Sequence, residues 1–197
     1  MADQATKAFF GDGIERHLDA LYSVAIHLTR SNADAEDLVA EAVAKAWAAI
    51  DTLNDQARFR PWIFRILHNT FVSDYRKKSV RPLEASIDSN DNAEDDLANL
   101  LGEQSDDFLV WWSNPEREFF NNLLGQTLMD ALDDIPDAFS TVIVLVNVEG
   151  FTYDETAEVL GIAPGTVRSR MKRGRTMLQK ALWHQRPGLQ EGIEHDA

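Results

Sequence analysis

The most strongly basic stretch of the sequence lies near its C-terminal end, between residues 168 and 175. Five of these eight residues are Arg or Lys. On one helix such cations can neutralise DNA phosphates, and an arginine can donate two hydrogen bonds to a guanine in the major groove. The candidate DNA-contacting residues are Arg168, Ser169, Arg170, Lys172, Arg173 and Arg175. The simpler alternative is a solvated basic helix that closes a helical bundle.

A second group of residues suited to nucleic acid lies between residues 58 and 78. Basic residues at 58, 60, 65, 76, 77 and 78 are interleaved with Phe59, Trp62 and Tyr75. Aromatic rings can stack on unpaired bases while the cations follow the phosphate backbone. On a helix, one continuous polar stripe would be formed by Arg65, Asn69, Ser73 and Arg76. The stripe predicts either a surface for single-stranded DNA or an ordinary solvated face.

The elements around the basic stretch have the signals of two short helices joined by a tight turn. Thr152 and Glu155 form a T-x-x-E capping box, Gly161 ends the first helix, and Pro164 begins a second that extends to about Trp183. The apolar face of that second helix consists of Val167, Met171, Gly174 and Leu178. This order predicts a helix-turn-helix with its basic residues facing away from the seam.

The residues before the helix-turn-helix give a mixed signal. Six residues recur at helical spacing and predict an amphipathic helix: Phe120, Leu123, Leu124, Thr127, Leu128 and Ala131. The run Thr141–Val146 is rich in β-branched residues, so local propensity alone allows either a buried strand or a helix.

The first half of the chain predicts three helices. Apolar residues recur at helical spacing over residues 18–28, 35–50 and 63–71, with a break at Ser31-Asn32 and Pro61 near the start of the third helix. The expected buried sides include Leu18, Leu21, Leu28, Leu38, Ile63, Ile66, Leu67, Thr70 and Phe71. The fold class expected for the whole chain is therefore all-α, with two small helical domains.

Charge divides the chain into parts. The formal net charge is -14, but residues 1–83 are neutral overall, whereas residues 84–116 carry ten acidic and no basic residues. We expect an acidic linker at 84–116 between domains at 1–83 and 117–186, followed by a disordered tail at 187–197. The linker also contains the apolar cluster Phe108–Trp112, whose role the sequence does not indicate.

The sequence gives little evidence of a catalytic site or a metal site. Cysteine is absent, the five His are scattered without ligand spacing, and there is no Gly-rich phosphate loop or nucleophile motif. We therefore expect no catalytic residue, no metal and no cofactor. No apolar run is long enough to span a membrane, and the N-terminus lacks the layout of a signal peptide, so a cytoplasmic protein without membrane insertion is expected.

Several motifs resemble, in order, those of the extracytoplasmic-function (ECF) sigma factors of the sigma-70 family. Residues 34–47 resemble the region 2 helix that docks on RNA polymerase, and residues 59–78 resemble the segment that melts and reads the minus-ten element. Residues 134–139, 148–157 and 160–175 resemble region 4. The resemblance implies a region 2 helical bundle, a region 4 helix-turn-helix bundle and a helical Thr141–Val146.

The resemblance also implies a function: directing core polymerase to specific promoters. The residues at the upstream, minus-thirty-five element would be Arg168, Ser169, Arg170, Lys172, Arg173 and Arg175. The residues at the minus-ten element would be Phe59, Arg65, Asn69, Ser73, Arg76 and Lys77, with Phe59 helping to hold a flipped base. The contact with the polymerase clamp would involve Asp34, Glu36, Asp37 and Glu41, although these acids equally suit the start of a helix.

The implied partners are core RNA polymerase, through its clamp and flap regions, promoter DNA and an anti-sigma factor. The stretch from Asn69 to Lys78 resembles the branch that is controlled by zinc-dependent, redox-responsive anti-sigma factors. Two other functions stay open. One is a sigma-factor mimic that sequesters an anti-sigma factor, which would not need cationic DNA-facing stripes. The other is a conventional helix-turn-helix regulator, which would leave the first half of the chain unexplained.

Overall fold

The computed structural model describes residues 4–78, 128 and 130–184, and all the regular structure among them is helical. This confirms the all-α expectation for the described part of the chain. Its contacts form two units. The described residues of the first are 4–78 and 141–169, and those of the second are 128, 130–140 and 170–184. The expected linker at 84–116, with Phe108–Trp112, and the tail at 187–197 lie outside the described residues.

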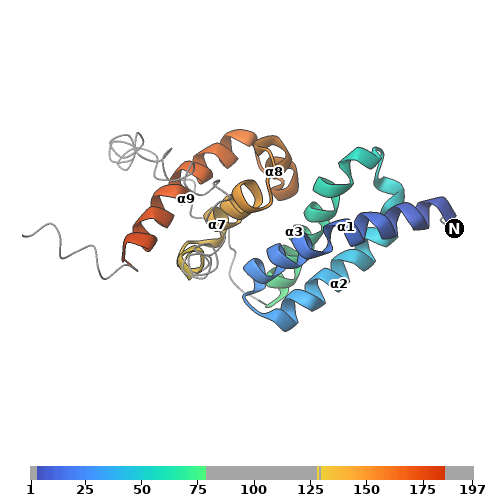
Figure 1. Ribbon diagram of the computed structural model, residues 1–197, viewed down its shortest axis with the longest axis horizontal. Coiled ribbons are helices and arrows are strands. Elements are labelled where there is room, and N and C mark those ends of the chain that lie inside the picture. The colour runs from blue at the N-terminus through green and yellow to red at the C-terminus, as the bar shows by residue number, and fades with distance from the viewer. Residues whose placement is uncertain (1–3, 79–127, 129, 185–197) are drawn as a thin grey trace, which may run out of the picture. The chain divides into compact units, whose positions relative to one another are not determined.

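Three long helices of the first unit lie side by side: α1 (Gln4–Thr29), α2 (Asn32–Ala48) and α3 (Phe59–Lys78) (Figure 1). Each buries one apolar stripe, as expected for amphipathic helices around a shared core. The residues at the centre of this core include Leu21, Ala25, Ala35, Ala42, Ile63, Phe64 and Leu67.

The expected buried sides are confirmed in most positions. Leu21, Leu28, Leu38, Ile63, Leu67 and Thr70 are buried. Ile66 and Phe71 are half-buried, and Leu18 is exposed. The buried residues of α1 include Phe10, Gly13, Leu21 and Val24, and Leu18 is not among them.

The break between α1 and α2 falls where the sequence predicts it. Arg30 has a left-handed backbone (φ 56°) and its N–H donates to the carbonyl of Ile26 at 2.7 Å, which ends α1. Ser31 then caps α2, its hydroxyl accepting a hydrogen bond from the Asp34 N–H at 3.4 Å.

Two turns of 3-10 helix connect α2 to α3: η1 (Ile50–Thr52) and η2 (Gln56–Arg58). Asp55 caps η2 by accepting from the Ala57 N–H at 2.9 Å, and α3 follows directly at Phe59. Pro61 lies in the first turn of α3, where its missing N–H costs no helical hydrogen bond.

The ambiguous run before the helix-turn-helix is helical, and the strand alternative is wrong. Helix α7 (Asp137–Ile143) continues into a π-helical turn, η4 (Val144–Val148). Val142, Ile143, Val144 and Leu145 are all buried. Burial of these side chains outweighs their local β propensity, which spans only about 1 kcal/mol among residues.

The last two helices are α8 (Tyr153–Leu160) and α9 (Pro164–His184), as the capping signals predict. The second unit buries Leu132, Ile135 and Phe139, together with Met171 and Leu178 of α9. Within the described ranges, no helix is both long and apolar enough to cross a membrane.

Candidate nucleic-acid interface

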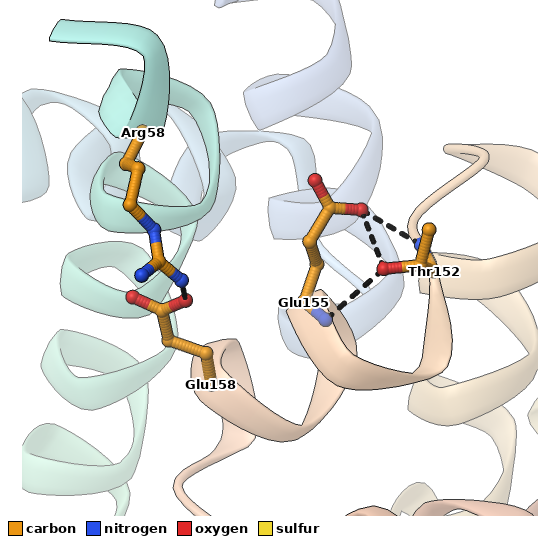
Figure 2. Close-up of polar contacts among 4 residues, drawn as sticks. All are labelled: Arg58, Thr152, Glu155 and Glu158. Carbon is orange, nitrogen blue, oxygen red and sulfur yellow. Dashed lines mark hydrogen bonds and ion pairs between the residues drawn. The ribbon is translucent and has the colours of Figure 1, made fainter. Parts of the chain in front are cut away.

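The helix-turn-helix begins with the capping box that the sequence predicts, drawn in Figure 2. The Thr152 hydroxyl accepts from the Glu155 N–H at 3.2 Å, and the Thr152 N–H donates to the Glu155 carboxylate at 2.8 Å. These bonds satisfy two donors that a helix start leaves unpaired. The hydrogen bond from the Thr152 backbone is also the main reason that the pKa of Glu155 lies below its ordinary value of 4.5.

The turn between the two helices depends on Gly161. Its backbone is left-handed (φ 67°), a conformation that is costly for residues with a Cβ. The Gly161 N–H donates to the carbonyl of Ala157, and the Ile162 N–H donates to the same carbonyl at 3.1 Å. The chain can therefore reverse in a few residues and begin α9 at Pro164.

Helix α9 separates a buried seam from a basic face. Val167, Met171, Gly174 and Leu178 are all buried, which confirms the predicted seam. Arg168, Ser169 and Lys172 are exposed, whereas Arg170, Arg173 and Arg175 are half-buried. The Ser169 hydroxyl donates to the Thr166 carbonyl at 3.0 Å. The arrangement presents several cations along one helix, where they can neutralise phosphates and reach base edges in a groove.

Arg175 lies beside the seam. Its side chain is half-buried, and its Nε is buried without a hydrogen-bond partner among the described residues. Its partly buried side chain therefore suits it less for reading DNA than the exposed Arg168.

The polar stripe on α3 faces outward over its described length. Arg65, Asn69 and Ser73 are exposed, on the side opposite the buried Ile63, Leu67 and Thr70. The side chains of Arg76 and Lys77 lie outside the described residues. The described part of the stripe is available to a nucleic-acid strand.

Phe59 occupies a different environment from the rest of its predicted set. It is only 4% exposed and lies in an aromatic cluster with Phe9, Phe10, His17 and Trp62. Its ring does not face solvent, so this geometry gives it no access to a flipped base. Its place at the first residue of α3 instead makes it an anchor for the loop that leads into that helix.

The surroundings of Phe59 include two residues that are not part of the predicted site, Gly13 and His17. Gly13 is buried where any Cβ would come within 2.7 Å of the Phe59 ring. His17 stacks on the same ring, and burial lowers its pKa, with smaller contributions from Arg60 and Arg16. The sequence signal for this cluster is the helical spacing of Phe9, Gly13 and His17, which places all three on one face of α1.

Arg58 and Arg60 belong to the basic residues between positions 58 and 78 but not to the predicted site. Arg58 forms an ion pair with Glu158 of α8 (Figure 2). Arg60 donates to the Glu149 carbonyl and lies over the Phe151 ring, with its guanidinium carbon 4.1 Å from the ring centroid. Both cations therefore contact the segment that contains the start of the helix-turn-helix.

The acidic residues predicted to contact polymerase all lie on the exposed side of α2. Asp34, Glu36, Asp37 and Glu41 are exposed, and Glu41 pairs with Lys45 at 2.6 Å. Asp34 also lies in the first turn of α2, where a carboxylate stabilises the helix by its attraction to the positive end of the helix dipole. Among the residues that the structure describes, there is no group of three or more His, Cys, Asp or Glu that could hold a metal ion.

Comparisons with known proteins match both halves of the chain. A model of sigma-70 region 2 matches residues 14–81, and a model of sigma-70 region 4 matches residues 125–178. The chain is 31% identical to the ECF RNA polymerase sigma factor SigE of Mycolicibacterium smegmatis, over 91% of this chain and 64% of that relative. It is also 31% identical to the ECF RNA polymerase sigma factor EcfG of Rhodopseudomonas palustris, over 87% of this chain and 84% of the relative.

A solved structure is similar over nearly the whole chain. It is the co-crystal structure of the sigma factor RpoE in complex with the anti-sigma factor NepR from Bartonella quintana. The TM-score is 0.61 at 27% identity, with 90% of this chain and 98% of that chain covered. The chain therefore belongs to the sigma-70 family as an ECF sigma factor, a non-enzymatic protein that directs RNA polymerase to promoters.

Proposed function

We propose that this sigma factor selects promoters through two separate surfaces. The basic face of α9 reads the minus-thirty-five element as duplex DNA, and the polar stripe of α3 binds the separated minus-ten strand. The observation that carries the proposal is the exposure of Arg168, Ser169 and Lys172 above a fully buried seam. Arg65, Asn69 and Ser73 make the corresponding surface on α3, and Arg76 and Lys77 extend it by sequence.

Each surface has a different physical task. Binding at the upstream duplex fixes the position of the protein on DNA, because phosphate contacts set register and base contacts specify sequence. Binding of unpaired bases at α3 offsets the cost of unstacking, which is a few kcal/mol per flipped base. Polymerase supplies the catalysis. The buried Phe59 holds the entry to α3 in place instead of stacking on a base.

We assign the protein partners to separate parts of the chain in the same way. The exposed acids of α2 (Asp34, Glu36, Asp37 and Glu41) bind the polymerase clamp, region 4 binds the flap, and the complex acts in the cytoplasm. The RpoE of Bartonella quintana is in complex with the anti-sigma factor NepR. By analogy, an anti-sigma factor sequesters this chain until its signal arrives.

The test is promoter-selective transcription in vitro with core polymerase on a library of genomic fragments. The wild-type chain should create start sites that core polymerase alone does not use. Arg173→Ala should weaken transcription from these sites by the equivalent of about 1–3 kcal/mol if Arg173 reads a base. The matched control is Lys180→Ala, which removes one charge from an exposed position farther along α9.

The double variant Arg168→Ala/Arg173→Ala gives the sharpest outcome. Unchanged start-site selection by this variant would exclude α9 as the reader of the upstream element. A wild-type chain that creates no start sites yet binds an anti-sigma factor would instead be a sigma-factor mimic.

A further inference from the structure

One aromatic residue of α1 contacts both ends of the connection between α2 and α3. The Phe10 ring lies edge-to-face against Trp47 near the end of α2, with ring centroids 5.1 Å apart. It also lies edge-to-face against Phe59, the first residue of α3, at 5.9 Å. Phe10 is 7% exposed, whereas Trp47 is 37% exposed. A single buried ring therefore joins the end of one helix to the start of the next.

Two further residues of α1 fix the position of the Phe59 ring. Phe9 meets this ring edge-to-face at 5.5 Å, and Gly13 leaves space for it where a Cβ would come within 2.7 Å. Edge-to-face pairs have preferred ring orientations, so these contacts set the direction in which α3 begins as well as its distance from α1. We call the set of Phe9, Phe10, Gly13, Trp47 and Phe59 the aromatic brace.

The connection itself, residues 49–58, is shaped by local bonds and placed by its ends. The Arg58 N–H donates to the Asp55 carbonyl at 3.0 Å, a bond that shapes the connection but does not orient it on the bundle. Ile50 is buried, whereas Asp55 and Arg58 are exposed. The ion pair of Arg58 with Glu158 is at the surface and contributes little. The placement of the connection therefore depends on Ile50 and on the two helix ends that the aromatic brace joins.

A displacement at the start of α3 also reaches the polar stripe, because the hydrogen bonds along a helix make it move as a unit. Arg65, Asn69 and Ser73 are exposed on the helix that Phe59 begins. Side chains that recognise a ligand must be held to within about 0.5 Å of their productive geometry. The aromatic brace therefore controls the geometry of a surface with which it shares no residue.

We propose that the aromatic brace sets the base preference of this chain at the minus-ten element. Phe10 and Trp47 act as positioning residues for the polar stripe and for the connection that precedes it. Phe10 does so without touching DNA, because its ring is buried between the two helix ends. Loss of either ring of this pair lets the start of α3 shift relative to α2. The inference rests on the proposed role of α3 in binding the separated minus-ten strand.

The test measures base preferences as ratios, which do not depend on how much of the protein is folded. The template is one start site that the wild-type chain creates on the genomic library, with its minus-ten and minus-thirty-five elements randomised. Each template carries a transcribed barcode that identifies its promoter. The full chain and core polymerase transcribe the pool, and sequencing of the barcodes gives the preference for each base at each position.

The informative variants are Phe10→Leu and Trp47→Leu, each of which removes one ring of the pair that joins the helix ends. Trp47→Leu changes the more exposed position and carries the test if Phe10→Leu does not fold. Trp47→Phe is the conservative variant, because it keeps a ring at this position. The matched control is Leu18→Ala, which removes an apolar side chain from α1 at a position that is 44% exposed and outside the brace.

Phe10→Leu should change the preference at one or more minus-ten positions by about threefold or more, since a displaced side chain loses part of the discrimination that a base contact provides. Trp47→Leu should change the same positions, and the double variant should add little, because both residues act through one contact. Trp47→Phe and Leu18→Ala should keep the wild-type preferences. Preferences at the minus-thirty-five element should stay the same in every variant.

Two results would overturn the inference. One is a lower transcript yield from Phe10→Leu and Trp47→Leu with wild-type ratios at the minus-ten element, which would mean that the brace only stabilises the fold. The other is an equal change of preference at both promoter elements, or an equal change in Leu18→Ala, which would mean that the effect is not specific to the start of α3.

Asn69→Ala tells failure of this inference apart from failure of the proposed function. If Asn69→Ala changes the minus-ten preferences while Phe10→Leu and Trp47→Leu do not, the polar stripe stands and only the role of the brace is lost. If the two brace variants change the preferences while Asn69→Ala does not, the polar stripe is lost as the strand-binding surface, and the brace acts through the connection instead.

Discussion

Phe59 illustrates how a residue type suited to one chemistry can serve another. An aromatic residue beside arginines predicts base stacking, yet this ring is enclosed by Phe9, Phe10, His17 and Trp62. The exposed members of its predicted set are the polar ones, Arg65, Asn69 and Ser73. Stacking partners inside the protein therefore compete with bases for the same ring.

Gly13→Ala should destabilise the protein, because the new Cβ would approach the Phe59 ring to 2.7 Å. Overpacking of this kind costs about 1–3 kcal/mol, more than the gain of up to ~1 kcal/mol from replacing a helical glycine. Urea unfolding of the full chain measures the change. The control is Gly11→Ala, in the same helix with no atom within 4 Å of its Cβ, which should stabilise. Equal effects of the two substitutions would contradict the close packing.

The helix starts show where local chemistry and fold agree. Ser31 and Thr152 cap α2 and α8, and Gly161 ends α8, all at the positions that the sequence indicates. The π-helical η4 is different, because its β-branched residues favour a strand locally and become helical through burial. Capping depends on a few neighbouring residues, whereas the state of η4 depends on the burial of its side chains.

Glu155→Gln should lower stability at neutral pH and remove part of its acid dependence. Hydrogen bonds from Thr152 hold the pKa of Glu155 below 4.5, so the ionised carboxylate stabilises the folded state. This contribution is complete above the unfolded pKa of about 4.5 and is lost as the pH falls through the lower folded pKa. Urea unfolding of wild type and variant at neutral and acid pH measures the difference.

The control for this substitution is Asp154→Asn, in the same first turn but outside the capping box. It should lower stability at neutral pH less than Glu155→Gln does, because Asp154 takes no part in the capping box. A constant difference between wild type and Glu155→Gln across the acid range would show that the carboxylate charge is not what stabilises the cap.

At the scale of the whole molecule, the distribution of charge matters more than its sum. The net charge of -14 would disfavour binding to DNA. However, residues 84–116 carry most of the excess negative charge, and the basic face of α9 has no acidic residue. The basic face of α9 therefore attracts DNA phosphates, although the chain as a whole repels them.

Free protein should bind promoter duplex weakly, and its affinity should fall steeply as salt is raised. Replacing Arg170 with Ala should reduce the slope of log affinity against log salt by about one if Arg170 contacts a phosphate. Fluorescence anisotropy of a labelled promoter fragment measures the slope, for the free chain and for the complex with core polymerase. Lys180→Ala should leave it unchanged, and tight, salt-insensitive binding by the free chain would contradict the electrostatic account.

The sequence by itself determined the helical class, the two capped helices around Gly161, the seam of α9 and the outward stripe of α3. These follow from periodicity and capping, which act between residues a few positions apart. Only the tertiary structure decided that Phe59 is buried against Gly13 and that Arg58 and Arg60 meet Glu158 and Glu149. Those outcomes join residues about 45 to 100 positions apart, and no local pattern encodes which distant surfaces will meet.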